Sequence, residues 1–170
     1  MSATTADATP MTVAAAMPRL AANAALAILL GGALATTLFD LYGQAVSPML
    51  GFAKLAPVPL ATQAWGVLFG APSENGGTLL HYVAGLVAYP AGWALLWRPV
   101  QARVVALPWW LSATAYGVAL WVFALFVMAH LVVGLPAFLG FSGISWVALV
   151  GHVLFALVAA AVMRPRLAAA

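Results

Sequence analysis

Four long apolar stretches, separated by proline, glycine and charged residues, dominate the hydrophobic pattern of this chain. They cover about residues 20–43, 78–97, 108–133 and 142–163. A helix needs about 20 apolar residues, at about 1.5 Å rise per residue, to cross the roughly 30 Å hydrocarbon core of a bilayer. The pattern therefore predicts an all-α, polytopic integral membrane protein in which a bundle of four transmembrane helices forms the fold.

Individual residues indicate where these spans begin and end, and one proline indicates an irregularity inside the second span. Pro108 suits the first turn of a helix, and Ser142 is a suitable N-cap for the last span. Arg98-Pro99 follows the second span and predicts its end. Pro90 lies inside the second span and should kink it, because its ring removes a backbone hydrogen bond.

Residues 19–166 form a single membrane domain in this prediction, with a flexible tail at residues 1–18 and a short tail at 167–170. A cleaved signal peptide is an alternative for the first apolar run, because Gly32–Ala35 contains a small-x-small pattern. The run from Leu20 to Phe39 is longer than the roughly 7–15 residues of a signal-peptide core. That length favours a retained first span.

The longest connection, residues 44–77, is unusually apolar for a loop. Its prolines and the run Glu74–Gly77 are turn signals. Leu60–Phe69, in contrast, is apolar enough to lie in the membrane interface as a short helix, with Trp65 at the depth of the lipid headgroups. We therefore expect this outer loop to pack on the protein instead of extending into water.

Composition and charge exclude several classes of protein. Hydrophobic residues make up 66% of the 170 residues and charged residues 5%, compared with about 25% charged in soluble domains. The six basic residues form no block, which excludes a nucleic-acid interface. The chain has no cysteine, so disulfides, thiolate metal sites, iron–sulfur clusters and covalent haem attachment are excluded.

The basic residues also predict how the chain lies in the membrane. With four spans, all but Lys54 fall on one side: Arg19, Arg98, Arg103, Arg164 and Arg166. An excess of lysine and arginine marks the cytoplasmic side, so both termini are predicted to be cytoplasmic. The alanine-rich, cysteine-free composition is typical of a bacterial inner membrane protein.

The scarce polar residues of the spans are the candidates for chemistry. An ionisable group in a span is costly and needs water or a partner. Asp40 and Gln44 lie one turn apart at the outer end of the first span, where residues three and four apart share a helix face. His81 and His130 are predicted at a similar height in the second and third spans. We therefore predict a polar cluster of Asp40, Gln44, His81 and His130.

A second candidate site lies deeper in the membrane. His152 is about ten residues into the fourth span, which places it near the middle of the bilayer at about 1.5 Å per residue. Tyr116 in the third span is the other polar residue predicted there. Both residues lie on faces that point toward neighbouring helices.

The first interpretation of these polar groups is structural. Polar side chains on packed helix faces commonly form interhelical hydrogen bonds, and stripes of small residues such as Ala84, Ala88 and Gly92 let helices approach closely. This interpretation predicts a non-enzymatic accessory or scaffolding component of a membrane assembly, without cofactor or metal. Its partners are the lipid bilayer and another membrane protein or a second copy of the chain.

Other interpretations use the polar cluster chemically. A carboxylate beside an imidazole favours the protonated ring, which suits a proton relay or a hydrogen-bonding site for a quinone. His81 and His130 offer two axial ligands for haem b, and a small-molecule carrier is a further alternative. A metal site is disfavoured because no His-x-x-x-His spacing occurs, and the common nucleotide-binding, hydrolase and zinc-protease motifs are absent.

Overall fold

The computed structural model describes residues 13–168, with side chains over 21–167, and every regular element in this part of the chain is a helix. Four helices are long and apolar enough to span a membrane: Ala21–Met49, Glu74–Val104, Trp109–Val132 and Gly143–Leu167. The all-α class and the four candidate spans are thus confirmed for the described residues. The first, second and fourth helices extend beyond their predicted C-terminal ends, and the second continues past Arg98-Pro99, where its end was wrongly predicted. The third helix lies within one residue of its predicted bounds.

The first of these helices begins with α1 (Val13–Leu41), continues through a π-helical turn at Tyr42–Val46 and ends as α2 (Ser47–Met49). Residues 13–18, predicted as tail, are therefore helical, in keeping with the high helix propensity of their alanines. The rest of that predicted tail, residues 1–12, lies outside the described residues. Pro48 is accommodated because it lies in the first turn of α2.

The second helix combines α-helical and π-helical segments. Its α-helical parts are α4 (Glu74–Val83), α5 (Tyr89–Ala91) and α6 (Arg98–Val104), and π-helical segments join them at Ala84–Ala88 and Gly92–Trp97. Pro90 lies in α5 between the two π-helical segments. Proline has no backbone N–H to donate to the preceding turn, so an irregularity was expected here. It takes the form of the wider π-helical turns before and after Pro90.

The outer connection folds into a helical hairpin. α3 (Pro57–Phe69) includes the predicted helix Leu60–Phe69 and ends at Gly70, whose φ of 91° suits a glycine C-cap. The turn predicted at Glu74–Gly77 is wrong, because these residues form the first turn of α4. Ser73 caps that turn by accepting a hydrogen bond from the Gly76 N–H at 3.1 Å. Trp65 of α3 packs directly on Gly76.

The third helix, α7 (Trp109–Val122), continues as a ten-residue π-helical segment, Phe123–Val132. A left-handed turn at Ala137–Phe141 then leads to α8 (Gly143–Ala168). Phe138 and Leu139 adopt φ values of 50° and 52° in this turn, a conformation that costs roughly 1–2 kcal/mol per residue. Trp121 of α7 holds the turn in place, with its ring centroid 4.6 Å from that of Phe138.

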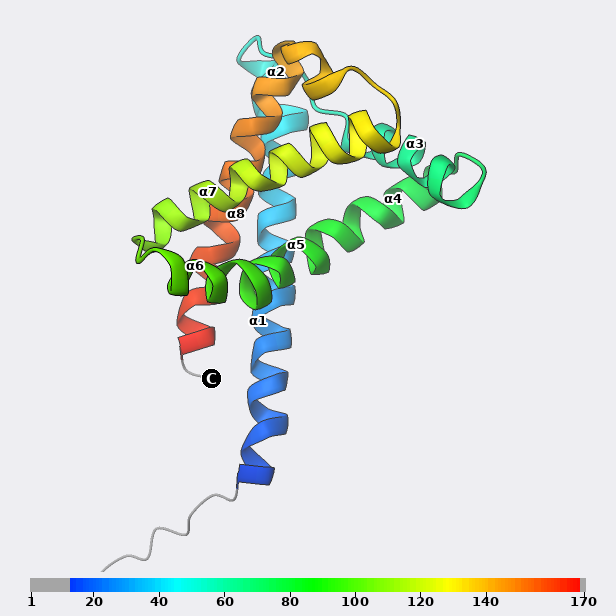
Figure 1. Ribbon diagram of the computed structural model, residues 1–170. Helices are drawn as coiled ribbons and strands as arrows, with labels where there is room; N and C mark the ends of the chain where they lie inside the picture. Colours follow the sequence, from blue (N-terminus) through cyan, green and yellow to red (C-terminus); the bar gives the residue numbers. More distant parts are fainter. Residues whose placement is uncertain (1–12, 169–170) are drawn as a thin grey trace, which may run out of the picture.

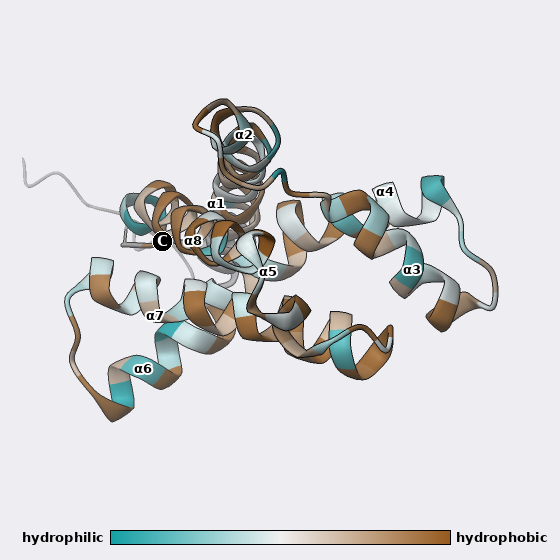
Figure 2. Cartoon of the chain, turned by 90° about the horizontal axis from the view of Figure 1, so that it is seen from above, coloured by the Kyte–Doolittle hydropathy of each residue, from teal (hydrophilic) through white to brown (hydrophobic). Residues whose placement is uncertain are grey.

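The helices form a central pair crossed by two oblique helices. α1 and α8 run side by side, whereas α7 and the Glu74–Val104 helix cross them at an angle (Figure 1). Seen from above, α1 and α8 are viewed nearly along their axes while α4 and α7 run across the picture (Figure 2). The α3–α4 hairpin lies to one side of the central pair. This arrangement brings α1, α3, α8 and the two oblique helices around one space.

Two glycines allow close crossings between the long helices. A Cβ at Gly117 of α7 would lie 2.5 Å from the Cα of Val153 in α8. A Cβ at Gly32 of α1 would lie 2.8 Å from the carbonyl oxygen of Gly85 in the second helix. Real Cβ atoms do not come this close to backbone, so both crossings require glycine.

Candidate functional site

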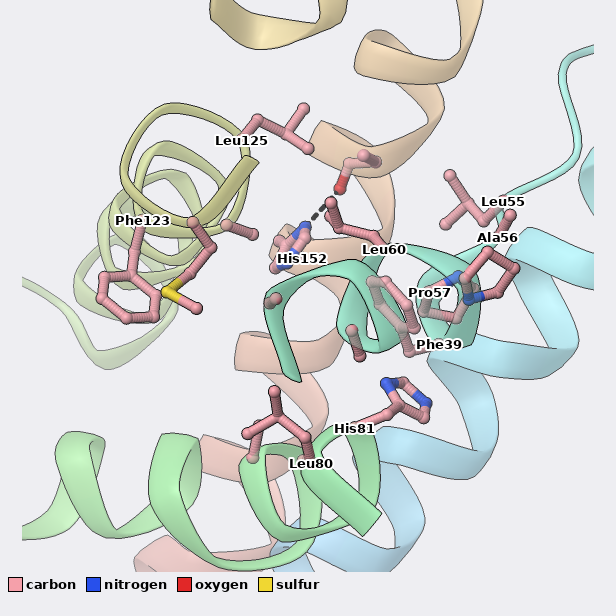
Figure 3. Close-up of a pocket in the computed structure, with 18 of the residues that line it drawn as sticks. Phe39, Leu55, Ala56, Pro57, Leu60, Leu80, His81, Phe123, Leu125 and His152 are labelled. Atoms are coloured by element: carbon pink, nitrogen blue, oxygen red, sulfur yellow. Dashed lines mark hydrogen bonds between the residues drawn. The ribbon is translucent and has the colours of Figure 1, made fainter. Parts of the chain in front are cut away.

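A cavity of about 470 Å³ lies where α1, α3, α8, the second helix and the Phe123–Val132 segment meet (Figure 3). It is partly open to the surroundings, and its walls are mostly aliphatic and aromatic. The polar residues in its lining are Thr36, Gln63, His81, Tyr89 and His152. We call this space the histidine cavity.

Asp40 and His81 form a hydrogen-bonded pair at the edge of the histidine cavity. The His81 Nε2 lies 3.1 Å from one carboxylate oxygen of Asp40 and 3.2 Å from the other. Side-chain exposure is 13% for His81 and 20% for Asp40, so the pair is largely shielded. Because an ionised carboxylate only accepts hydrogen bonds, Nε2 carries the proton. In a neutral His81 ring, Nδ1 is then the acceptor available to a ligand.

Gln44 extends this pair toward the surface. Gln44 lies one turn after Asp40 on the first helix. Its Nε2 donates at 3.0 Å to the Asp40 oxygen that lies 3.1 Å from His81. Gln44 itself is exposed, and Asp40 does not line the cavity. The structure therefore arranges Gln44, Asp40 and His81 in a row from the surface to the cavity wall.

His152 borders the histidine cavity from α8. Its side chain is buried, and its Nδ1–H donates to the carbonyl oxygen of Ala148 at 2.7 Å (Figure 3). This bond leaves Nε2 as a hydrogen-bond acceptor in the neutral ring. The Phe39 ring contacts both imidazoles, with centroid distances of 5.1 Å to His152 and 6.4 Å to His81. Two imidazoles thus border one apolar space.

Thr36 adds an unpaired polar atom to the same wall. Its side chain is 3% exposed, and no described residue pairs with its Oγ1. A buried polar group without a partner costs roughly 1–3 kcal/mol, and this oxygen packs against Gly85 of the second helix. The sequence pattern places Thr36 on the Asp40 face of the helix but does not distinguish it from a structural threonine.

His130 is not part of this arrangement. Its Nδ1 bonds to the carbonyl oxygen of Leu135 at 2.7 Å, and its ring packs on Phe126. It neither lines the histidine cavity nor contacts Asp40. The Phe123–Val132 segment is π-helical, with wider turns than an α-helix, so the face predicted for His130 from α-helical spacing is wrong.

Tyr116 and His152 are not joined either. The Tyr116 hydroxyl donates to the carbonyl oxygen of Tyr89 at 2.6 Å, whereas His152 bonds within its own helix. Tyr116 therefore ties α7 to the second helix, and it does not line the histidine cavity. The predicted mid-membrane site is replaced by a hydrogen bond between helices and a separate cavity residue.

Changing Tyr116 to phenylalanine should measure how much that interhelical hydrogen bond contributes to the free energy of unfolding. We expect the free energy of unfolding in detergent to fall by about 0.6–1.7 kcal/mol, the range measured for hydrogen bonds between membrane helices. Tyr82→Phe is the matched control, because Tyr82 is 44% exposed. An equal effect of the two changes would show that the Tyr116 bond to Tyr89 does not stabilise the fold.

Sequence reasoning missed the part of the site that α3 contributes. Leu60 and Ala64 of α3 line the histidine cavity, as does Leu139 of the left-handed turn. The apolar character of residues 44–77 indicated that this connection packs on the protein, but not that it closes a cavity. Within the described residues, no group of three or more His, Cys, Asp or Glu side chains is placed to hold a metal ion.

Comparison of the chain with protein-family models, with curated proteins and with solved structures finds no match.

Proposed function

We propose that this chain is an integral membrane protein that binds a lipid-soluble molecule bearing hydroxyl groups, of the quinol type, in the histidine cavity. The observation that carries the proposal is the placement of His81 and His152 in the wall of a mostly apolar cavity. Ligand sites are typically apolar spaces of about 300–1,000 Å³ with a few converging polar groups. The cavity, at about 470 Å³, lies within this range.

The hydrogen-bonding capacity of the two histidines favours a donor ligand. The neutral His152 ring offers Nε2 as an acceptor because Nδ1 is engaged by Ala148. His81 offers Nδ1 as an acceptor because Nε2 is engaged by Asp40. A ligand that meets both must donate hydrogen bonds, and a quinol combines two hydroxyl donors with an apolar ring.

The Asp40–His81 pair suits proton uptake from such a ligand. A proton accepted at Nδ1 of His81 would produce an imidazolium whose Nε2–H still faces the carboxylate at 3.1 Å. The carboxylate stabilises that charge. Gln44 links Asp40 to the surface. The proposal therefore includes transfer of one proton from a quinol hydroxyl to His81 Nδ1, which leaves a quinolate anion beside the imidazolium and involves no change of oxidation state.

Haem b is left out of the proposal. The two axial ligands expected for it, His81 and His130, do not border a common cavity, and His130 Nδ1 is engaged by Leu135. A quinol needs no ligand pair, and hydrogen bonding from His81 and His152 is sufficient to orient it.

For location, we propose a bacterial inner membrane with both termini cytoplasmic. The support is the composition and the concentration of arginine on one side of the spans. Arg98 and Arg164, from the ends of two different helices, indeed line one and the same cavity. The Asp40–His81 pair then belongs to the outer half of the protein.

Two alternative functions predict different behaviour of this cavity. A non-enzymatic accessory or scaffolding component would bind a membrane protein or a second copy and leave the cavity without a specific ligand. A small-molecule carrier would release its ligand on both sides of the membrane, and the partly open cavity is compatible with that role. Ligand binding, measured first, separates the scaffold from the other two.

The direct test is calorimetric titration of the full-length protein in nanodiscs with a short-chain benzoquinol, kept reduced, and with its dimethyl ether. We expect the quinol to bind saturably. The ether, which lacks the donor hydroxyls, should bind with an affinity at least about tenfold lower. Equal affinities would exclude the hydrogen-bonding role of the histidines. Absence of binding by either compound would favour the scaffold.

A cavity-filling variant locates the site. Ala124 is half-buried and lines the histidine cavity, so Ala124→Phe should abolish quinol binding by occupying the space. Ala119 is also half-buried but lies outside the cavity lining, and Ala119→Phe is the matched control. Retained binding in Ala124→Phe would place the ligand elsewhere.

A further inference from the structure

A second cavity, of about 480 Å³, lies where α6, the start of α7 and the end of α8 meet. We call it the arginine cavity, because Arg98 of α6 and Arg164 of α8 both line it. The lining also includes Trp93, Gln101 and Trp109. None of these residues belongs to the histidine cavity.

The two arginines of this cavity differ from their neighbours in their bonding. Arg103 donates to the carbonyl oxygen of Pro99 at 3.3 Å, and Arg166 donates to that of Val162 at 2.7 Å. Within the described residues, the side chains of Arg98 and Arg164 make neither a hydrogen bond nor an ion pair. Arg98 and Arg164 are thus two exposed basic residues that line one cavity and pair with no described residue.

Aromatic residues orient this arrangement. The Arg164 guanidinium lies 4.7 Å from the centre of the Trp109 ring, a cation–π contact that holds its charge at the cavity. In addition, the Trp97 Nε1–H donates to Ser112 Oγ at 3.1 Å, and Ser112 donates to Gln101 Oε1 at 3.0 Å. This network fixes Gln101 in the cavity wall.

Trp93 provides independent evidence that an acceptor is missing. Its side chain is 4% exposed and lines the arginine cavity, yet its Nε1–H has no acceptor among the described residues. A buried indole N–H normally finds a hydrogen-bond partner. A ligand with oxygen acceptors and negative charge would complement the two arginines of this cavity.

We propose that the arginine cavity binds the phosphate group of an anionic phospholipid. Guanidinium groups match phosphate oxygens in geometry as well as charge. Basic pockets between membrane helices on the cytoplasmic side bind the headgroups of anionic lipids, and tryptophans gather at headgroup depth. The arginine cavity lies at the ends of three candidate spans, where such headgroups are found. This inference is independent of the quinol site.

Native mass spectrometry of the full-length protein in detergent tests the proposal. The probes are phosphatidylglycerol, phosphatidylcholine with the same acyl chains, and inorganic phosphate alone. We expect phosphatidylglycerol adducts on the wild-type protein and a loss of affinity of roughly 30-fold in the Arg98→Gln/Arg164→Gln double variant, about fivefold per arginine. The matched control is Arg103→Gln/Arg166→Gln, which removes the same charge outside the cavity.

Each outcome decides the proposal. Loss of adducts in the cavity variant and their retention in the control support a lipid site at Arg98 and Arg164. Equal losses in the two variants would overturn it in favour of general charge attraction. Equal retention of both lipids by the wild-type protein would also overturn it, and binding of inorganic phosphate without phosphatidylglycerol would assign the cavity to a free anion. Circular dichroism of each variant establishes that it is folded.

Discussion

Replacing Gly117 with leucine is expected to prevent stable packing of α7 on α8. A Cβ at this position would lie 2.5 Å from the Cα of Val153 and 2.7 Å from the carbonyl oxygen of His152. Both atoms are backbone, so no side-chain rotation relieves the clash and the helices must separate. We expect the free energy of unfolding to fall by about 3 kcal/mol or more, the upper end for overpacked sites. Denaturant titration of the detergent-solubilised protein measures it.

The same substitution at an open glycine is the control. A Cβ at Gly143 would meet the Ala53 Cβ at 3.7 Å, an ordinary contact, and Gly143 is exposed. Gly143→Leu should therefore change the stability by less than about 0.5 kcal/mol. A Gly117→Leu protein as stable as Gly143→Leu would mean that α7 and α8 do not cross at Gly117.

Replacing His152 with leucine is expected to weaken quinol binding while the protein remains folded. The change deletes the Nε2 acceptor in the histidine cavity and places an aliphatic side chain of similar size in an apolar wall. A quinol hydroxyl would then be buried without a partner, which costs about 1–3 kcal/mol and weakens binding by roughly 5- to 150-fold. Calorimetric titration and thermal unfolding measure the two effects on the same preparation.

His130→Leu is the matched control, because the two histidines bond to the backbone in the same way. Each places Nδ1 at 2.7 Å from a carbonyl oxygen, but His130 does not line the cavity. Its loss leaves the carbonyl of Leu135 without that donor, so stability should fall by about 1 kcal/mol while quinol affinity is unchanged. Reduced affinity in both variants, or in His130→Leu alone, would contradict the assignment of His152 as a ligand-binding residue.

The sequence predicted those parts of the structure that depend on regular helices. Four apolar runs of sufficient length became four candidate spans. Asp40 and Gln44, spaced by one turn, form a side-chain hydrogen bond on the first helix. The closeness of Asp40 to His81 followed from similar depth on two neighbouring helices, and the structure places them at 3.1 Å. These features need only helical rise and periodicity.

Irregular backbone accounts for what the sequence could not predict. The position of His130 was wrong because ten residues around it form a π-helical segment, which α-helical spacing does not describe. The pairing of His152 with Tyr116 was not found because each side chain bonds to a nearby backbone carbonyl. The histidine cavity depends on where α3 packs beside the spans. The hydrophobic periodicity of the spans does not predict the position of α3.

In the membrane location that we propose, the slanted path of the Glu74–Val104 helix should let the protein adapt to hydrophobic mismatch. Its 31 residues would measure roughly 46 Å as a straight helix, well beyond the hydrocarbon thickness of about 30 Å. A helix that is already tilted can steepen in a thick bilayer and flatten in a thin one at small cost per ångström. The π-helical segments on both sides of Pro90 give it two places to bend. We therefore expect the protein to remain folded in lipids of widely different acyl-chain length.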